Sequence, residues 1–199
     1  MKFIRRAGVI RPRRVGVLAA AFNPPTVAHV HLLEAALRYV DELLCVVPCM
    51  YPHKEFHGAS LEQRLAMLCA PGIKPDYSVA VSDGGLFIEI AEECRAAYGA
   101  EVEPYFICGR DAAERIVGWD YGERGAIERM FTKFHLLVAP RRGPYAPPQE
   151  FRHRIHALEV RPEIESVSST ELRERIAEGK PWEHLAPAPV REFVRRIYG

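Results

Sequence analysis

A histidine at the start of an expected helix is the strongest candidate for chemistry in this sequence. An apolar run that begins at Val15 ends at Pro24 and Pro25, and a helical pattern follows from Thr26, with His29 in its first turn. Thr26 can cap this helix, and the prolines cannot continue a strand. Because the N–H groups at a helix start bind anions, the pattern predicts a strand, an anion-binding turn and a helix, with His29 beside the anion.

A second helix start of this kind lies near the end of the sequence, in residues 167–173. Ser168 and Glu171 have the spacing of a capping box, and Arg173 follows about one turn inside the helix. Two helix N-termini together predict a polyphosphate ligand. Taken alone, this segment also fits an ordinary helix cap with an exposed arginine, and that alternative stays open.

Three more polar or aromatic residues come after expected strands, on the side of the sheet where the strands end. Open parallel sheets bind their ligands at this edge. Lys54 leaves the second expected strand and is either solvated or able to neutralise a phosphate. Asp111, in Gly109-Arg-Asp, could cap a helix, accept hydrogen bonds from ribose hydroxyls, or do both. Trp119 is either a core residue or a flat ring for stacking.

Length and composition limit the class of protein. The chain has 199 residues, of which 48% are hydrophobic, and a formal net charge of +1. This length suits one sizeable core, and a nearly neutral charge disfavours a nucleic-acid partner. We expect residues 1–14, which are rich in arginine, to be a basic N-terminal extension, and residues 15–199 to form a single domain whose C-terminal helical part covers about 165–199.

The cellular setting is inferred from what the sequence contains. The five cysteines form no Cys-x-x-Cys pair, which is typical of reduced core thiols and predicts a cytoplasmic protein. A short apolar run that ends in prolines disfavours a secretory signal, and no segment has the length of a membrane span. The histidines show no paired ligand spacing, so we expect no protein-held metal. Whether the chain forms a homo-oligomer stays open.

Apolar runs and helical patterns alternate along the first two thirds of the chain, which predicts an α/β fold with a mostly parallel sheet. The expected strands cover residues 15–21, 43–47, 77–81, 105–108, 135–139 and 157–160. The expected helices cover residues 27–39, 61–69, 86–98, 112–117, 170–178 and 190–198. Residues 141–148 are rich in proline and predict a surface loop.

Four segments in order resemble the nicotinate (or nicotinamide) mononucleotide adenylyltransferases of the nucleotidylyltransferase superfamily. Phe22-Asn-Pro-Pro-Thr-Val-Ala-His29 is similar to the phosphate motif of that family, and Pro52-His-Lys54 to its Pro-His-Lys loop. Phe106-Ile-Cys-Gly-Arg-Asp111, followed by Trp119, resembles a third motif, and residues 167–173 resemble a fourth, Ile-Ser-Ser-Thr-x-x-Arg. Each motif alone is weak, but four in the family's order cover nearly the whole chain.

The resemblance implies a Rossmann-like, doubly wound domain that joins ATP to a pyridine mononucleotide and releases pyrophosphate. Transition-state charge would be stabilised by His29 and Arg173, and Mg²⁺ would arrive on the ATP phosphates. The resemblance also implies that Lys54 and Trp119 bind the mononucleotide. Leu86 and Phe87 would contribute too, because they lie in the segment whose backbone recognises the nicotinate carboxylate in bacterial members. The residues implied in ATP binding are Phe22, Asn23, Thr26, His29, Gly109, Asp111, Ser168, Ser169, Thr170 and Arg173.

The sequence departs from the family pattern at the strand end and at the acceptor segment. Ala19, Ala20, Ala21 and Ala28 stand where the family has glycine-containing turns, and added methyl groups narrow the approach to a phosphate. Gly85-Leu-Phe87 replaces the Ser-Tyr-Thr pattern of the bacterial nicotinate enzymes. Two alternatives therefore stay open: transfer to another phosphorylated acceptor, and nucleotide binding without turnover.

Overall fold

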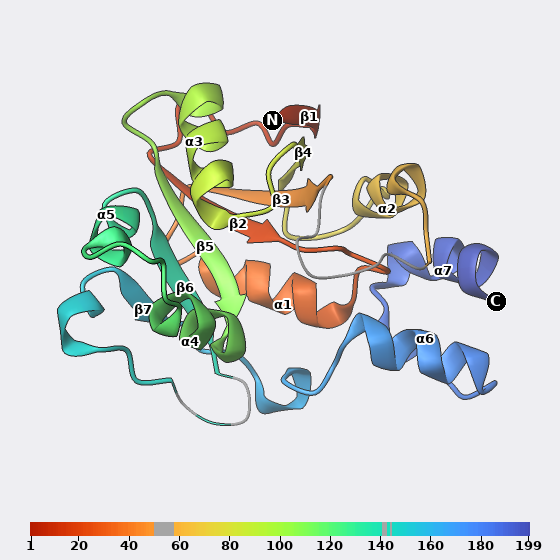
Figure 1. Cartoon of the computed structure of the whole chain (residues 1–199). Coiled ribbons are helices and arrows are strands. Elements are labelled where there is room, and N and C mark those ends of the chain that lie inside the picture. Colours follow the sequence, from red (N-terminus) through yellow and green to blue (C-terminus); the bar gives the residue numbers. More distant parts are fainter. Residues whose placement is uncertain (50–57, 141–142, 144) are drawn as a thin grey trace.

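A seven-stranded sheet forms the centre of the molecule (Figure 1). The computed structural model describes residues 1–49, 58–140, 143 and 145–199. The strand order is β1-β4-β3-β2-β5-β6-β7, and every neighbouring pair is parallel except β1 and β4. The strands are β1 (Lys2–Arg5), β2 (Arg14–Ala19), β3 (Glu42–Pro48), β4 (Ser78–Ser82), β5 (Glu103–Gly109), β6 (His135–Ala139) and β7 (Ile155–Ala157).

The strand order creates a switch point between β2 and β5. From β2 the chain builds outward through β3 to β4, and it then returns to add β5 on the other side of β2. Connections that leave two such neighbouring strands diverge to opposite faces and open a crevice at the carboxyl ends. The segments that follow Ala19 and Gly109 are therefore placed beside one another at this edge.

Helices cover both faces of the sheet. The α-helices are α1 (Val27–Ala36), α2 (Leu61–Leu68), α3 (Phe87–Tyr98), α4 (Arg110–Gly118), α5 (Ala126–Phe131), α6 (Ser169–Ala177) and α7 (Arg191–Tyr198). Short 3₁₀ turns follow at η1 (Gln149–Phe151), η2 (Pro162–Ile164), η3 (Glu183–Leu185) and η4 (Ala188–Val190). One core packs α1, α2, α6 and α7 on the sheet, and a second packs α3, α4 and α5 on the opposite face.

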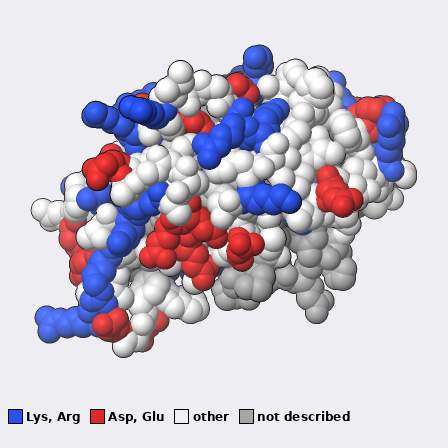
Figure 2. All heavy atoms as spheres, turned by 90° about the horizontal axis from the view of Figure 1, so that it is seen from above, with Lys and Arg blue, Asp and Glu red and all other residues white. Residues whose placement is uncertain are grey.

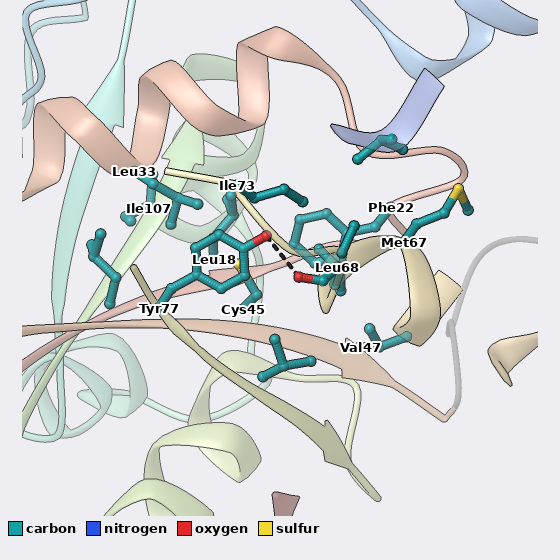
Figure 3. Packing of buried hydrophobic residues seen from close by; sticks show 14 of the residues in the cluster. Leu18, Phe22, Leu33, Cys45, Val47, Met67, Leu68, Ile73, Tyr77 and Ile107 are labelled. Carbon is teal, nitrogen blue, oxygen red and sulfur yellow. Dashed lines mark hydrogen bonds between the residues drawn. The ribbon is translucent and has the colours of Figure 1, made fainter. Parts of the chain in front are cut away.

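Alternation along the strands supplies both cores. In β3, for example, Leu43, Cys45 and Val47 belong to the core under α1, whereas Leu44 and Val46 belong to the core under α3. Figure 3 shows the first core from close by, where the Tyr77 hydroxyl donates to the Leu68 carbonyl at 2.9 Å. A sheet buried on both faces confirms the predicted α/β, doubly wound, mostly parallel fold.

The start of the chain corrects the expectation of a basic extension. Strand β1 pairs antiparallel with β4, Arg5 donates to the Tyr77 carbonyl at 3.1 Å, and the Arg6 guanidinium lies over the ring of Phe3. These arginines are thus packed against the domain. Sequence reasoning missed this strand because it has only four residues, with Lys2 and Arg5 on either side of its two apolar residues; charged side chains are common on edge strands.

Other expected elements are confirmed with shifted bounds, and some are corrected. The first helix ends at Ala36 instead of Tyr39, and the last strand covers Ile155–Ala157 rather than residues 157–160. Helix α5 is not among the helices expected from the sequence. All five cysteines are free, as expected, but Cys49 is exposed and only Cys45, Cys94 and Cys108 are buried. Residues 141, 142 and 144 of the expected surface loop lie outside the described residues.

Charge is mixed over the face of the molecule shown in Figure 2. Basic and acidic side chains form small separate groups there, and neither sign covers the face. In the part of the chain that the structure describes, helices long and apolar enough to cross a bilayer are absent.

An aromatic stack in the second core fixes the start of α3. Phe106 is fully buried, and its ring stacks on Phe87 with centroids 4.3 Å apart and meets Phe134 edge-on at 5.1 Å. We expect Phe106→Ala to lower the free energy of unfolding by about 3–5 kcal/mol, because it removes a fully packed ring. Urea unfolding would measure this loss.

The matched control is Tyr121→Ala, since Tyr121 is an aromatic residue that is 39% exposed. It should change the free energy of unfolding by about 1 kcal/mol or less. Equal losses for the two variants would contradict the packing described here.

Candidate active site

The chain between β2 and α1 turns sharply and presents the start of α1 at the crevice. Phe22 has a left-handed φ of +48°, and its side chain is only 1% exposed, so the ring fills the core beneath the helix. Thr26 is fully buried and has the extended backbone of an N-cap. We call residues 21–25 the proline turn. It leads directly into the N-cap of α1, so a helix starts after the prolines, as the sequence predicts.

His29 is held in one orientation by the N-cap residue. Its Nδ1 accepts the Thr26 backbone N–H at 3.0 Å and lies 2.8 Å from the Thr26 hydroxyl. The other side of the ring packs on Phe22, with centroids 5.0 Å apart. Because Nδ1 is an acceptor, the proton of the neutral ring is on Nε2. Burial lowers the pKa of His29 to about 4, so at neutral pH it is an uncharged donor through Nε2–H.

The start of α6 is bonded directly to the proline turn. The Ser169 hydroxyl donates to the Pro24 carbonyl at 2.7 Å, and Arg173 Nη1 donates to the Asn23 carbonyl and, at 3.2 Å, to that of Ser169. Arg173 Nη2 reaches Thr170 Oγ1 at 3.4 Å. The structure thus brings together the two helix starts that the sequence singled out.

The predicted capping box of α6 is half formed. Ser168 Oγ accepts the Glu171 N–H at 3.1 Å, which is the first half of the box. The Glu171 carboxylate pairs with Arg175 at 3.0 Å. Glu171 thus binds an arginine one turn further along the helix, which is a charged partner, instead of the uncharged N–H of the N-cap residue.

The residues expected to hold the rest of the ligands lie after β4 and β5. Gly109 is the N-cap of α4, and Asp111 is exposed in its first turn. Trp119, directly after α4, is 57% exposed, and Leu86, the N-cap of α3, is 51% exposed. Lys54 lies outside the described residues.

Two of the expected binding residues have side chains that are committed elsewhere. The Phe87 ring packs on Phe106 in the core, so only its backbone is left for a ligand. Asn23 is 5% exposed, and its Oδ1 accepts hydrogen bonds from the Ala59 N–H and the Tyr198 hydroxyl. These two residues shape the site without presenting a side chain to its surface.

Sequence reasoning missed several residues that fix the site. Arg64 Nη1 donates to the Ala21 carbonyl at 3.1 Å, and Tyr198 contacts Asn23 from the end of α7. The Glu89 carboxylate accepts the N–H groups of Gly85 and Leu86, both at 2.9 Å. Only Glu89 had a local signal, because it lies three residues after an N-cap; the others act across long sequence separations.

Metal ligands do not gather in the described part of the chain, which holds no group of three or more His, Cys, Asp or Glu side chains suited to an ion. The charge available at the proline turn comes from the Arg173 guanidinium, the Nε2–H of His29 and the N–H groups that start α1 and α6. This arrangement can bind an anion with several oxygens.

His29 offers a direct test of this geometry. Long-range ¹H–¹⁵N NMR should show an Nε2–H tautomer whose pKa is about 4. Because this value lies below the ordinary 6.5, the unfolded chain takes up the proton first as the pH falls, and the contribution of His29 should reduce the free energy of unfolding between pH 6.5 and 4. An Nδ1–H tautomer, or a pKa near 6.5, would contradict the contact with Thr26.

Comparisons with known proteins identify the family of the chain. Residues 17–175 match the model of the cytidylyltransferase-like family. A relative from Moorella thermoacetica, named "Probable nicotinate-nucleotide adenylyltransferase", is 32% identical over 94% of this chain and 91% of its own. One of the same name from Gemmatimonas aurantiaca is 27% identical over 91% and 89%.

Solved structures show the same fold at low identity. The nicotinic acid mononucleotide adenylyltransferase of Plasmodium falciparum, complexed with NaAD, has a TM-score of 0.64 at 14% identity and covers 92% of this chain and 95% of its own. The family model spans most of the sequence, and the Moorella relative matches nearly end to end. The chain therefore belongs to the cytidylyltransferase-like family and, within it, to the nicotinate-nucleotide adenylyltransferases.

Proposed function

We propose that the protein transfers the adenylyl group of ATP to nicotinate (or nicotinamide) mononucleotide, giving a dinucleotide and pyrophosphate in NAD biosynthesis. The observation that carries this proposal is the meeting of two helix starts at the proline turn, where Ser169 and Arg173 bond to the Pro24 and Asn23 carbonyls. The names of the curated relatives, which cover more than nine tenths of the chain, support the same reaction.

The reaction needs alignment and charge neutralisation from the protein. A phosphate oxygen of the mononucleotide attacks the α-phosphorus of ATP, the bond from that phosphorus to the bridging oxygen breaks, and pyrophosphate leaves. The attacking phosphate is already a nucleophile, so no side chain has to activate it. Negative charge grows on the oxygens around the α-phosphorus and on the leaving pyrophosphate, where fixed donors lower the barrier.

His29 and Arg173 are the proposed catalytic residues. Nδ1 of His29 is bound to Thr26, which aims Nε2–H away from the N-cap and keeps the ring neutral. Arg173 is fixed by the Asn23 and Ser169 carbonyls and so brings a positive charge at a set position. Donors that are already oriented need no reorganisation during the reaction. The N–H groups behind Thr26 and the hydroxyls of residues 168–170 complete the proposed polyphosphate site.

The nucleoside parts are proposed to bind after β4 and β5. A Cβ added at Gly109 would meet no atom within 4 Å, so the space above this residue is open to a ribose. Asp111 is exposed there, and its carboxylate can accept hydrogen bonds from ribose hydroxyls. The exposed ring of Trp119 can stack on a pyridine, with Leu86 as a further apolar contact. Lys54 is proposed to bind the mononucleotide phosphate.

Mg²⁺ is proposed to enter with ATP. Mg²⁺ keeps several waters and binds mainly through substrate phosphates in sites of this kind, where it neutralises charge on the phosphates. Apart from that contribution, the chain's own donors act on the reacting groups as described above.

A second candidate is transfer to another phosphorylated acceptor. It is favoured by Glu89, whose carboxylate already occupies the N–H groups of Gly85 and Leu86 at the start of α3. An anionic substituent on the acceptor would have to displace this carboxylate from those two donors. A screen of phosphorylated acceptors separates the two candidates.

The first test is pyrophosphate release with Mg-ATP and either nicotinate mononucleotide, nicotinamide mononucleotide or no acceptor. Release should require a mononucleotide, and His29→Ala should lower kcat by about 10²–10³-fold, because it removes one fixed donor.

His31→Ala is the matched control. His31 lies on the same helix, pairs with Glu34 at 2.9 Å and points to Arg161, so its loss should leave kcat unchanged. Silence with both mononucleotides would reject the proposed function; nucleotide-dependent thermal stabilisation without product would then indicate binding without turnover.

A further inference from the structure

Three carbonyl groups of the proline turn accept hydrogen bonds from two later helices, α2 and α6. Arg64 of α2 donates to the Ala21 carbonyl at 3.1 Å. Arg173 and Ser169 of α6 donate to the carbonyls of Asn23 and Pro24. Buried carbonyl groups need hydrogen-bond donors, and those of the proline turn find them in side chains of α2 and α6. The shape of the turn therefore depends on residues that follow it far along the chain.

Tyr198 adds a hydrogen bond to the side chain of Asn23 in the proline turn. Its hydroxyl donates to Asn23 Oδ1, across 175 positions of sequence, and the same oxygen accepts the Ala59 N–H at 3.1 Å. Two donors saturate this acceptor. Burial raises the pKa of Tyr198 to about 12, so at neutral pH the hydroxyl keeps the proton that it donates.

Asn23 also joins the proline turn to the chain that follows Lys54. A Cβ added at Gly58 would lie 2.6 Å from Asn23 Nδ2, so the amide packs directly on the Gly58 backbone. Gly58 and Ala59 are the residues that come after the segment containing Lys54 and before α2. Asn23 thus belongs to the turn proposed for ATP and contacts the two residues, Gly58 and Ala59, that lead into α2.

We propose that Tyr198 is a positioning residue for nucleotidyl transfer, acting through Asn23. Its hydroxyl holds the Asn23 amide against Ala59, and the Asn23 carbonyl in turn holds the guanidinium of Arg173. Loss of the hydroxyl removes one of the two donors to Asn23 Oδ1 and so weakens the support of the proline turn and of Arg173. This inference rests on the proposed function for its kinetic readout, but its effect on ATP binding can be measured without turnover.

The test compares Tyr198→Phe with Tyr39→Phe. Each variant loses one hydroxyl that donates a hydrogen bond, and the Tyr39 hydroxyl donates to the Ala157 carbonyl at 3.0 Å, where β7 ends. Tyr198→Phe should lower kcat/KM for ATP about tenfold, because small misplacements in a site are costly to the rate. Tyr39→Phe should leave kcat and both KM values unchanged, although the two melting temperatures fall by similar amounts.

A double-mutant cycle separates positioning from general stability. In an Asn23→Leu background, Tyr198→Phe should have no further effect on kcat/KM, because the hydroxyl acts through the amide. Asn23→Asp keeps an oxygen for both donors and should retain more activity than Asn23→Leu. Full additivity of the Tyr198 and Asn23 effects would overturn the inference, as would wild-type kinetics for Tyr198→Phe.

The positioning role of Tyr198 can be tested even if the proposed function fails. If the wild-type protein releases no pyrophosphate with either mononucleotide, calorimetric binding of a non-hydrolysable ATP analogue replaces the kinetic assay. Weaker binding by Tyr198→Phe than by Tyr39→Phe supports the positioning role. Equal affinities for the two variants overturn it.

Discussion

The site depends on one constraint: the start of α1 is positioned for a ligand only if the carbonyl groups of the proline turn before it find hydrogen-bond donors. The bonds from Ser169 to the Pro24 carbonyl and from Arg173 to the Asn23 carbonyl meet this need. They also set the distance between the starts of α1 and α6. Structure and charge are therefore supplied by the same residues, since Arg173 satisfies the backbone and brings the cation to the anion site.

The sheet provides the frame for this contact. Because β2 and β5 are neighbours although they are not consecutive, the proline turn and the start of α4 share one edge. Cores on both faces keep these strands buried, so the ends of the strands hold their positions while the residues beyond them stay open to ligands. The proline turn and the start of α4 accordingly follow closely on buried strands, whereas α6 reaches the turn through its hydrogen bonds.

Local patterns in the sequence were sufficient for the fold and for the two helix starts. Strand alternation, helical periodicity and capping residues act over a few positions, and they led correctly to the parallel sheet and to the starts of α1 and α6. They could not show that Asn23 turns inward to Tyr198, because that contact depends on how α7 packs. Local patterns also could not show that the Phe87 ring packs on Phe106 in the core, because a residue at the start of a helix can face either the core or the solvent. The edge strand β1 lacked the uniform apolar run by which the other strands were found.

The dependence of the proline turn on α6 and α7 has a consequence for biosynthesis of the protein. These helices come after every strand of the sheet, so a growing chain on the ribosome completes its sheet sequence before the donors to Asn23 and Pro24 have been translated. A nascent or truncated chain that holds the sequence of the whole sheet therefore still lacks the donors that α6 and α7 bring to the proline turn.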